Sequence, residues 1–212
     1  MAMFHGSTEP VAVAILAKAP VPGLAKTRLT PVLGTDGAAN LQARFIERAV
    51  TTAQTAAIGP VTLWVTPDRH HPVFQTIAAL LGVAVAVQPE GDLGARMLAA
   101  IAAANGPAIV IGTDCPALTP DHLNAAARAL ADGVDVVIVP VDDGGYGLIG
   151  MQRPEPALFA GMTWSTSSVM AETRRRLTRL GLSWREPARL WDVDVPADLE
   201  RLSRAGLASL MR

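Results

Sequence analysis

Three basic side chains lie close together near the start of the chain, in a segment that contains two prolines and a glycine. The segment is Lys18-Ala-Pro-Val-Pro-Gly-Leu-Ala-Lys26-Thr-Arg28. A stiff loop suits phosphate binding, because backbone N–H groups and cations converge there without a large ordering cost. On the residues alone, a solvated loop whose cations face water is an equal alternative. The loop is not a Walker A motif, since Ala25 rather than Gly precedes Lys26.

Acidic side chains follow two later apolar runs. Asp114 comes directly after one run, and Asp142-Asp143 follow the next one. Basic and acidic loops at one edge of a sheet suggest phosphates together with a cation that neutralises them. Asp142-Asp143-Gly-Gly has the composition of a tight turn. That turn predicts a further strand, so the formal G-x-G-x-x-G at Gly145–Gly150 opens no helix and does not indicate a dinucleotide site.

Alternating strand and helix patterns surround these loops. Runs rich in Val and Ile predict strands at Val11–Ala17, Val61–Thr66, Val83–Gln88, Ala108–Gly112 and Val134–Pro140. Helical spacing predicts helices at Ala38–Ala56, Pro72–Leu81, Ala95–Ala104 and Pro120–Ala131. The alternation predicts a single α/β domain over residues 1–212, with a mostly parallel sheet covered on both faces. Ligands of such sheets bind beyond the carboxyl ends of the strands, where the charged loops follow.

Composition sets further limits on function. The chain has 212 residues, half of them hydrophobic, and a net charge of -1. This balance gives no reason to expect nucleic acid or an anionic membrane as a partner. The lone Cys115 cannot form an intramolecular disulfide, and we expect a small buried packing residue there. No apolar run reaches the ~20 residues of a membrane span. Met1–Pro10 lacks the pattern of a signal peptide, so we expect a cytoplasmic protein.

Five segments occur in order along nearly the whole chain: Ala17–Leu29, Gly112–Leu118, Asp143–Gly150, Trp164–Ser167 and Trp191–Leu199. Together they resemble the GT-A superfamily of nucleotide-diphospho-sugar transferases. The resemblance is closest to the rSAM/selenodomain-associated transferases, a group similar to molybdopterin-cofactor nucleotidyltransferases and phospholactate guanylyltransferase. It implies a Rossmann-like GT-A fold, an α/β/α sandwich, and a nucleotide-dependent transferase.

The resemblance implies two sets of nucleotide contacts. Lys18, Lys26 and Arg28 become contacts of the phosphates. Gln88, with Gly94 at the start of the next helix, falls in the segment that contacts the base or ribose in similar proteins. An ordinary amide at a strand end is the alternative for Gln88.

The resemblance also implies a site for Mg²⁺ or Mn²⁺. Asp114 becomes the principal metal ligand and Asp194 the second, with Asp192 as its substitute. Magnesium is typically held by one or two carboxylates together with substrate phosphates, so two ligands suffice. The alternatives are a turn-forming role for Asp114 and helix capping for Asp192 and Asp194.

The acceptor side is expected at Trp164–Ser168, whose hydroxyls precede a helix. The arginines of that helix lie opposite its apolar stripe and are predicted to form a solvated face. They are Arg174, Arg175, Arg176 and Arg179.

Nucleotidyl transfer from a nucleoside triphosphate to a small phosphorylated or hydroxyl acceptor, with release of pyrophosphate, is the favoured reaction. A triphosphate needs more than one cation, and Lys26 and Arg28 would stabilise charge on the departing oxygens. Asp143 could orient or deprotonate the acceptor, or it could simply form its turn. Thr113-Asp114-Cys115 also offers one carboxylate where many GT-A glycosyltransferases have Asp-x-Asp. The alternatives are a glycosyltransferase that uses a nucleotide-diphospho-sugar and a non-catalytic nucleotide-binding module. The base, the acceptor and the oligomeric state stay open.

Overall fold

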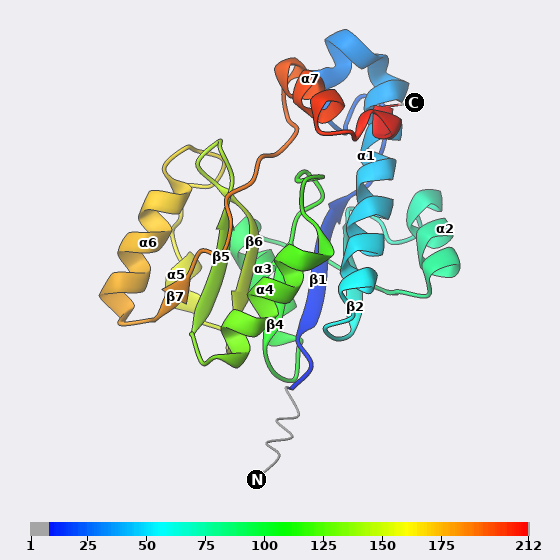
Figure 1. Ribbon diagram of the computed structural model, residues 1–212. Helices are drawn as coiled ribbons and strands as arrows, with labels where there is room; N and C mark the ends of the chain where they lie inside the picture. Colours follow the sequence, from blue (N-terminus) through cyan, green and yellow to red (C-terminus); the bar gives the residue numbers. More distant parts are fainter. Residues whose placement is uncertain (1–8, 212) are drawn as a thin grey trace.

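The apolar runs of the sequence form one mixed sheet in the computed structural model, which describes residues 9–211 (Figure 1). The strand order is β3-β2-β1-β4-β6-β5-β7. All five predicted strands are present within two residues of their expected bounds. The strands are β1 (Ala12–Lys18), β2 (Val61–Thr66), β3 (Ala84–Val87), β4 (Ala108–Ile111), β5 (Val136–Pro140), β6 (Tyr146–Met151) and β7 (Trp184–Arg185). Most of the Met1–Pro10 segment lies outside the described residues.

Strand β6 is the one antiparallel member of the described sheet. It pairs antiparallel with β4 and β5, whereas the other neighbouring strands are parallel. The tight turn that follows β5 explains this direction, because a parallel neighbour would need a long crossover connection. The strand expected after the turn is therefore confirmed, and Gly145–Gly150 lies in a hairpin.

Helices cover both faces of the sheet. Helices α1 (Thr30–Ala56), α2 (Pro72–Leu81) and α4 (Pro120–Ala131) pack on one face, where Ile46, Phe74 and Leu123 join the core. Helices α3 (Leu93–Ala102), α5 (Pro156–Phe159) and α6 (Val169–Leu180) pack on the other face around Ile101 and Met170. The three layers confirm the predicted α/β/α sandwich with a mostly parallel sheet.

Helix α1 begins eight residues before its predicted start at Ala38. Its first turn contains Pro31, and the helix is kinked at Gly34, whose φ of 71° lies in the left-handed region. A glycine adopts this conformation without steric penalty, so the kink is compatible with the sequence. The early glycines also weaken the apolar periodicity on which the prediction depended.

A small cap stands above the carboxyl ends of the strands (Figure 1). The cap consists of the short helix η1 (Thr27–Leu29), the start of α1, α7 (Pro196–Arg204) and η2 (Ala208–Met211). Its own apolar cluster includes Leu29, Leu41, Phe45, Val193 and Leu202. The cap therefore joins the first loop of the chain to its last helix. No helix within residues 9–211 is long and apolar enough to cross a membrane.

Candidate active site

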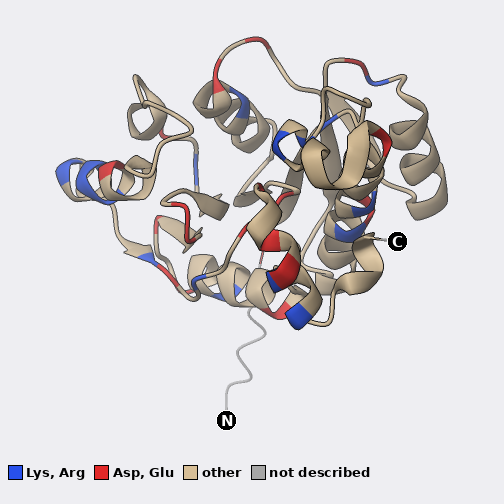
Figure 2. Cartoon of the chain, turned by 90° about the horizontal axis from the view of Figure 1, so that it is seen from above, with Lys and Arg blue, Asp and Glu red and all other residues tan. Residues whose placement is uncertain are grey.

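A cleft of about 990 Å³ opens at the carboxyl edge of the sheet, next to the cap. Eight of the nine residues predicted to function here line it: Lys18, Lys26, Arg28, Gln88, Asp114, Asp143, Asp192 and Asp194. Seen from above, basic and acidic segments are interspersed over several elements, so the molecule has no single-sign face in this view (Figure 2). The cleft itself concentrates both signs of charge.

Lys26 is held inside the protein by three partners. Its Nζ lies 2.8 Å from Asp114 Oδ1 and donates a hydrogen bond of 2.6 Å to the carbonyl oxygen of Val193. The same ammonium lies 5.5 Å from the centroid of the Phe45 ring. The Lys26 side chain is only 4% exposed, whereas that of Asp114 is 54% exposed. Lys26 thus orients Asp114, and Asp114 presents its carboxylate to the cleft.

Arg28 forms a second ion pair, with Asp194. Both side chains are exposed, so this pair contributes little to stability. Helix capping by Asp194 or Asp192 is not observed. Helix α7 begins at Pro196, and Asp198 accepts hydrogen bonds from the backbone N–H groups of Asp194 and Val195 instead. Neither Asp192 nor Asp194 is therefore used to cap α7, and the carboxylate of Asp194 is paired with Arg28 instead.

Asp192 lies half-buried among other carboxylates. Burial raises the pKa of Asp192 to about 6, and the negative charges of Asp143 and Asp114 act in the same direction. The segment that contains Asp192 is fixed by a 2.8 Å hydrogen bond from the backbone N–H of Val193 to the carbonyl oxygen of Asp114. Asp114, Asp143 and Asp192 thus lie in one region of the cleft, close enough for the charges of the first two to raise the pKa of Asp192.

These carboxylates have the chemistry of a magnesium site whose remaining ligands come from the substrate. Oxygen ligands suit Mg²⁺, which usually keeps waters and takes one or two carboxylates plus phosphate oxygens. Within residues 9–211, no three acidic, histidine or cysteine side chains converge as a ready-made metal cage. A magnesium site formed by Asp114 with Asp192 or Asp194 stays a prediction, one in which the substrate's phosphate oxygens and waters supply the other ligands.

Gln88 is tied to the backbone of two strands. Its Nε2 donates hydrogen bonds to the carbonyl oxygens of Ala17, at 3.1 Å, and Trp64, at 2.8 Å. Both amide hydrogens are engaged, as expected for the strand-end alternative. The Oε1 atom accepts a hydrogen bond of 3.4 Å from Nη1 of Arg96. Gln88 therefore reaches the cleft mainly through the arginine that it holds.

Gly94 is the predicted site residue that does not line the cleft. It is buried at the start of α3, where an added Cβ would lie 2.8 Å from Cζ2 of Trp164 and 3.0 Å from Cβ of Phe159. Its observed role is to let α3 pack closely against Trp164. A nucleotide contact at Gly94 stays a prediction.

Asp143 forms the turn between β5 and β6. Its Oδ1 accepts a hydrogen bond of 2.7 Å from the backbone N–H of Gly145. The adjacent Gly144 has a φ of 94° and packs directly against the backbone of Ser167. The turn therefore fixes the position of residues 164–168, here called the rim, whose Ser165, Thr166 and Ser167 line the cleft.

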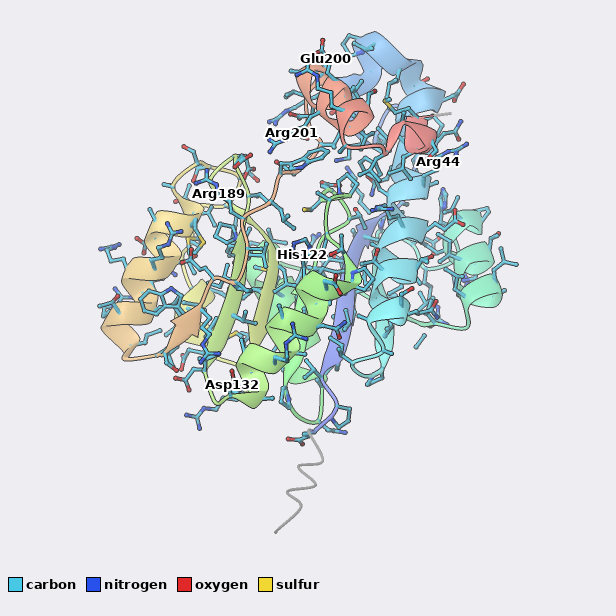
Figure 3. All side chains as sticks on the ribbon, viewed as in Figure 1. Arg44, His122, Asp132, Arg189, Glu200 and Arg201 are labelled. Atoms are coloured by element: carbon cyan, nitrogen blue, oxygen red, sulfur yellow. The ribbon has the colours of Figure 1, made fainter. Side chains whose placement is uncertain are left out.

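Asp142 forms ion pairs with two arginines. Its carboxylate lies 2.9 Å from Nε of Arg189 and 2.7 Å from Nη1 of Arg201, and these contacts lower its pKa. Arg201 also stacks over the Trp191 ring at 4.8 Å. In Figure 3, Arg201 lies on the cap and Arg189 lies below it at the top of the sheet. Asp142 thus joins the turn to the cap.

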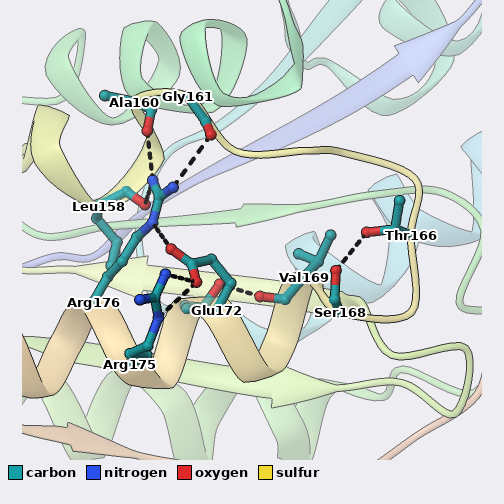
Figure 4. A network of polar contacts seen from close by, with 10 residues as sticks. Leu158, Ala160, Gly161, Thr166, Ser168, Val169, Glu172, Arg175 and Arg176 are labelled. Carbon is teal, nitrogen blue, oxygen red and sulfur yellow. Dashed lines mark hydrogen bonds and ion pairs between the residues drawn. The ribbon is translucent and has the colours of Figure 1, made fainter.

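Arg176 departs from the predicted solvated face. Its side chain is buried and pairs with Glu172 Oε1 at 2.6 Å (Figure 4). It also donates hydrogen bonds to the carbonyl oxygens of Leu158, Ala160 and Gly161, just before the rim. The other arginines of α6 are exposed, as expected. Helical spacing could not reveal that the turn after α5 covers this position.

Cys115 is a packing residue, as expected. It is buried, and burial raises the pKa of its thiol to about 12. A thiol with so high a pKa is not a nucleophile at neutral pH.

Sequence reasoning missed Arg96, which also lines the cleft. The available signal was a single charged residue within the otherwise apolar helix Leu93–Ala102.

Comparisons with known proteins place this geometry in context. Residues 49–166, more than half of the chain, match the family model described as "Uncharacterized protein conserved in bacteria (DUF2064)". The 2-phospho-L-lactate guanylyltransferase of Methanosarcina barkeri (strain Fusaro / DSM 804) is 25% identical over 180 residues, which cover 84% of this chain and 80% of that protein.

Solved structures share the fold over almost the whole chain. The Desulfovibrio desulfuricans G20 protein described as a putative nucleotide-diphospho-sugar transferase has a TM-score of 0.84 at 28% identity, covering 92% of this chain and 87% of its own. Rv0371c of Mycobacterium tuberculosis H37Rv, in complex with manganese, has a TM-score of 0.58 at 16% identity, with coverages of 93% and 100%. The expected resemblance to GT-A transferases, the fold and the transferase class are confirmed.

Proposed function

The chain belongs to the DUF2064 family, and from this premise we propose that it is a magnesium-dependent nucleotidyltransferase formed by one domain. The proposed reaction transfers a nucleoside monophosphate from a triphosphate to a small phosphorylated or hydroxyl acceptor and releases pyrophosphate. The observation that supports it best is the Lys26–Asp114 ion pair beside a second carboxylate, Asp192. The name of the Methanosarcina barkeri relative, a guanylyltransferase, supports the same reaction class.

The proposed roles of the basic residues follow from their exposure. Lys18 and Arg28 are exposed in the cleft and contact the phosphates of the nucleotide. Lys26 is nearly buried, so it holds Asp114 in place and reaches a phosphate only by leaving that carboxylate. Together these cations stabilise negative charge on the departing pyrophosphate.

The acidic residues bind the metal and orient the acceptor. Asp114, with Asp194 or Asp192, holds the magnesium ion, which when bound neutralises phosphate charge and aligns the phosphates. Manganese, present in the Rv0371c complex, has the same preference for oxygen ligands. Asp143 faces the cleft from the turn after β5 and orients an acceptor between that turn and the rim.

Glycosyl transfer is the second candidate. The likeness to the Desulfovibrio desulfuricans G20 protein, with its nucleotide-diphospho-sugar description, favours it. Asp114 can serve a diphosphate as well as a triphosphate, because both present oxygen atoms to a metal. The leaving group separates the two reactions: pyrophosphate in one, a nucleoside diphosphate in the other.

The test incubates the protein with magnesium, a cell extract as the source of acceptors, and either labelled triphosphates or labelled nucleotide sugars. We expect pyrophosphate release together with label from the α-phosphate on an acceptor. The Asp114→Ala variant provides the background rate of the extract. Release of a nucleoside diphosphate with transfer of the sugar would instead establish the glycosyl reaction.

A further inference from the structure

Two buried polar side chains lie behind the Asp114 carboxylate. Gln42, on the buried face of α1, is 5% exposed, and Thr113, just after β4, is 6% exposed. Gln42 Nε2 donates a hydrogen bond of 3.0 Å to Thr113 Oγ1, and no other hydrogen bond within residues 9–211 joins two buried side chains. Burying an amide and a hydroxyl costs free energy that an apolar pair of similar size would not, so packing alone does not favour these residue types here.

The direction of the hydrogen bonds in this group is set by Asp114. Thr113 Oγ1 lies 3.2 Å from Asp114 Oδ1. An ionised carboxylate only accepts hydrogen bonds, so the single hydroxyl hydrogen of Thr113 points to Asp114. The hydroxyl oxygen can then only accept from Gln42, which places Nε2 of that amide, and not its Oε1, against Thr113. Gln42, Thr113 and Asp114 therefore form a chain of donors, here called the relay, that ends on one carboxylate oxygen.

The relay ends on the same oxygen that the Lys26 ammonium contacts. Lys26 Nζ lies 2.8 Å from Asp114 Oδ1. Among residues 9–211, no donor forms a hydrogen bond with Oδ2, and the Asp114 side chain is 54% exposed in the cleft. The backbone of Asp114 is fixed separately, because its carbonyl oxygen accepts the hydrogen bond from the N–H of Val193. One carboxylate oxygen is thus held by the protein, and the other is left for a ligand.

We propose that Gln42 and Thr113 are positioning residues, which fix the Asp114 carboxylate through Oδ1 so that Oδ2 is the oxygen offered to the metal. The inference rests on the proposed function, in which Asp114 holds the metal ion. Loss of an outer partner that orients a ligand typically weakens metal affinity by about 10- to 100-fold. Lys26 contacts the same oxygen, but its positive charge repels a metal ion. The two neutral side chains orient the carboxylate without this repulsion.

The test measures manganese binding by the full-length protein in two ways. Electron paramagnetic resonance of the unbound ion gives the affinity for Mn²⁺ alone. Calorimetry gives the affinity for ATP, CTP, GTP and UTP, each with Mn²⁺ or with EDTA. Thr113→Val keeps the shape of the side chain and removes its hydroxyl. We expect it to weaken binding of Mn²⁺ and of the Mn²⁺ complexes by about tenfold, and to leave triphosphate binding in EDTA unchanged. Thr113→Ser, which keeps the hydroxyl, should recover most of the loss.

Gln42→Met tests whether the relay acts as a chain. The variant keeps the length of the side chain and removes its donor. It should weaken manganese binding by less than Thr113→Val does, because the Thr113 hydroxyl keeps its hydrogen and loses only its fixed direction. The double variant should bind manganese no more weakly than Thr113→Val alone, since Gln42 acts through Thr113.

Thr173→Val is the matched control. Thr173 is 1% exposed, and its hydroxyl donates a hydrogen bond of 2.8 Å to the carbonyl oxygen of Val169 within α6, on the opposite face of the sheet from α1. This variant also loses one buried hydroxyl, so it should lower the resistance to urea denaturation. It should leave manganese binding unchanged.

The outcomes separate this inference from the proposed function. Unchanged manganese affinity in Thr113→Val overturns the inference and leaves the metal role of Asp114 standing. An equal loss in Thr173→Val also overturns it, because the effect would then come from stability alone, and additive losses in the double variant exclude a chain. If the wild-type protein binds neither Mn²⁺ nor any of the four Mn²⁺ complexes, the proposed function fails, and this inference fails with it.

Discussion

Two sets of ion pairs in this protein use the same chemistry for opposite purposes. In the cleft, Lys26–Asp114 and Arg28–Asp194 join segments far apart in sequence, and each carboxylate is at least partly exposed. Beneath the rim, Arg176 pairs with Glu172 on one helix and is enclosed by backbone carbonyls. An enclosed pair cannot exchange partners without leaving buried groups unsatisfied, whereas a cleft pair can exchange its partner for a phosphate or a metal.

Removing the enclosed cation should produce the largest effect. Arg176→Met leaves three backbone carbonyl oxygens without their donor and Glu172 with Arg175 as its remaining partner. We expect the variant to lower the free energy of unfolding by about 3 kcal/mol. Urea denaturation measures the change. Arg174 lies on the same helix as Arg176 and forms an exposed ion pair with Glu186, which follows β7. Arg174→Met should lower the free energy of unfolding by only about 0–1 kcal/mol. Similar losses in the two variants would show that burial does not distinguish the pairs.

The exposed carboxylate of the cleft should matter for ligands and not for folding. Asp114→Ala should abolish the gain in triphosphate affinity that magnesium provides, about a hundredfold, or ~2.7 kcal/mol, for a metal contact of ordinary strength. Calorimetric titration of a nucleoside triphosphate into the protein, with magnesium or with EDTA, measures this gain. A variant that keeps the magnesium dependence would identify Asp114 as a turn-forming residue.

Lys26 should oppose metal binding when no nucleotide is present. Its ammonium is paired with the Asp114 carboxylate and therefore competes with a metal ion for it. Lys26→Met should strengthen the binding of magnesium alone by about tenfold, or ~1.4 kcal/mol, the free energy of one charge-assisted contact. Titration of Mg²⁺ into the nucleotide-free protein provides the measurement. Lys18→Met is the control, because the Lys18 ammonium donates to the carbonyl oxygen of Leu24 and not to a carboxylate. This variant should leave the binding of magnesium alone unchanged. Weaker magnesium binding in Lys26→Met would mean that Lys26 only positions the carboxylate.

Asp192 should have the smallest effect, because its carboxylate is only half-buried and solvent screens part of its charge. Its pKa of about 6 lies above that of the unfolded chain, so the folded state takes up a proton between about pH 6 and pH 4 that the unfolded state does not. Without metal, stability from this group rises as the pH falls through that window. Asp192→Asn should raise the melting temperature at pH 7.5 by one or two degrees, roughly, and leave it unchanged at pH 4. An equal rise at both values would exclude titration as the cause.

The resemblance supplied most of the nine predicted site residues, and eight of the nine line the cleft. Local patterns predicted strands β1 to β6 and most bounds of the four helices that were predicted. They succeeded because Val- and Ile-rich runs, proline and glycine determine local structure, and because strand ends in an α/β sheet meet at one edge. Ion pairs and hydrogen bonds between residues far apart in the sequence were not predictable. The pairing of Lys26 with Asp114 depends on the segment at Val193, and the burial of Arg176 depends on the turn at Gly161.

The contact between Gly144 and Ser167 limits how this enzyme can change by mutation. A Cβ at position 144 would lie 2.2 Å from the backbone oxygen of Ser167, and a backbone atom cannot move aside as a flexible side chain can. In a saturation library selected for activity, position 144 should therefore keep glycine, while the exposed side chains of Ser165 and Thr166 accept replacement. Under the proposed function, in which the acceptor lies between the turn and the rim, a new acceptor range would then evolve through the side chains of the rim, while the backbone of the turn stays constant.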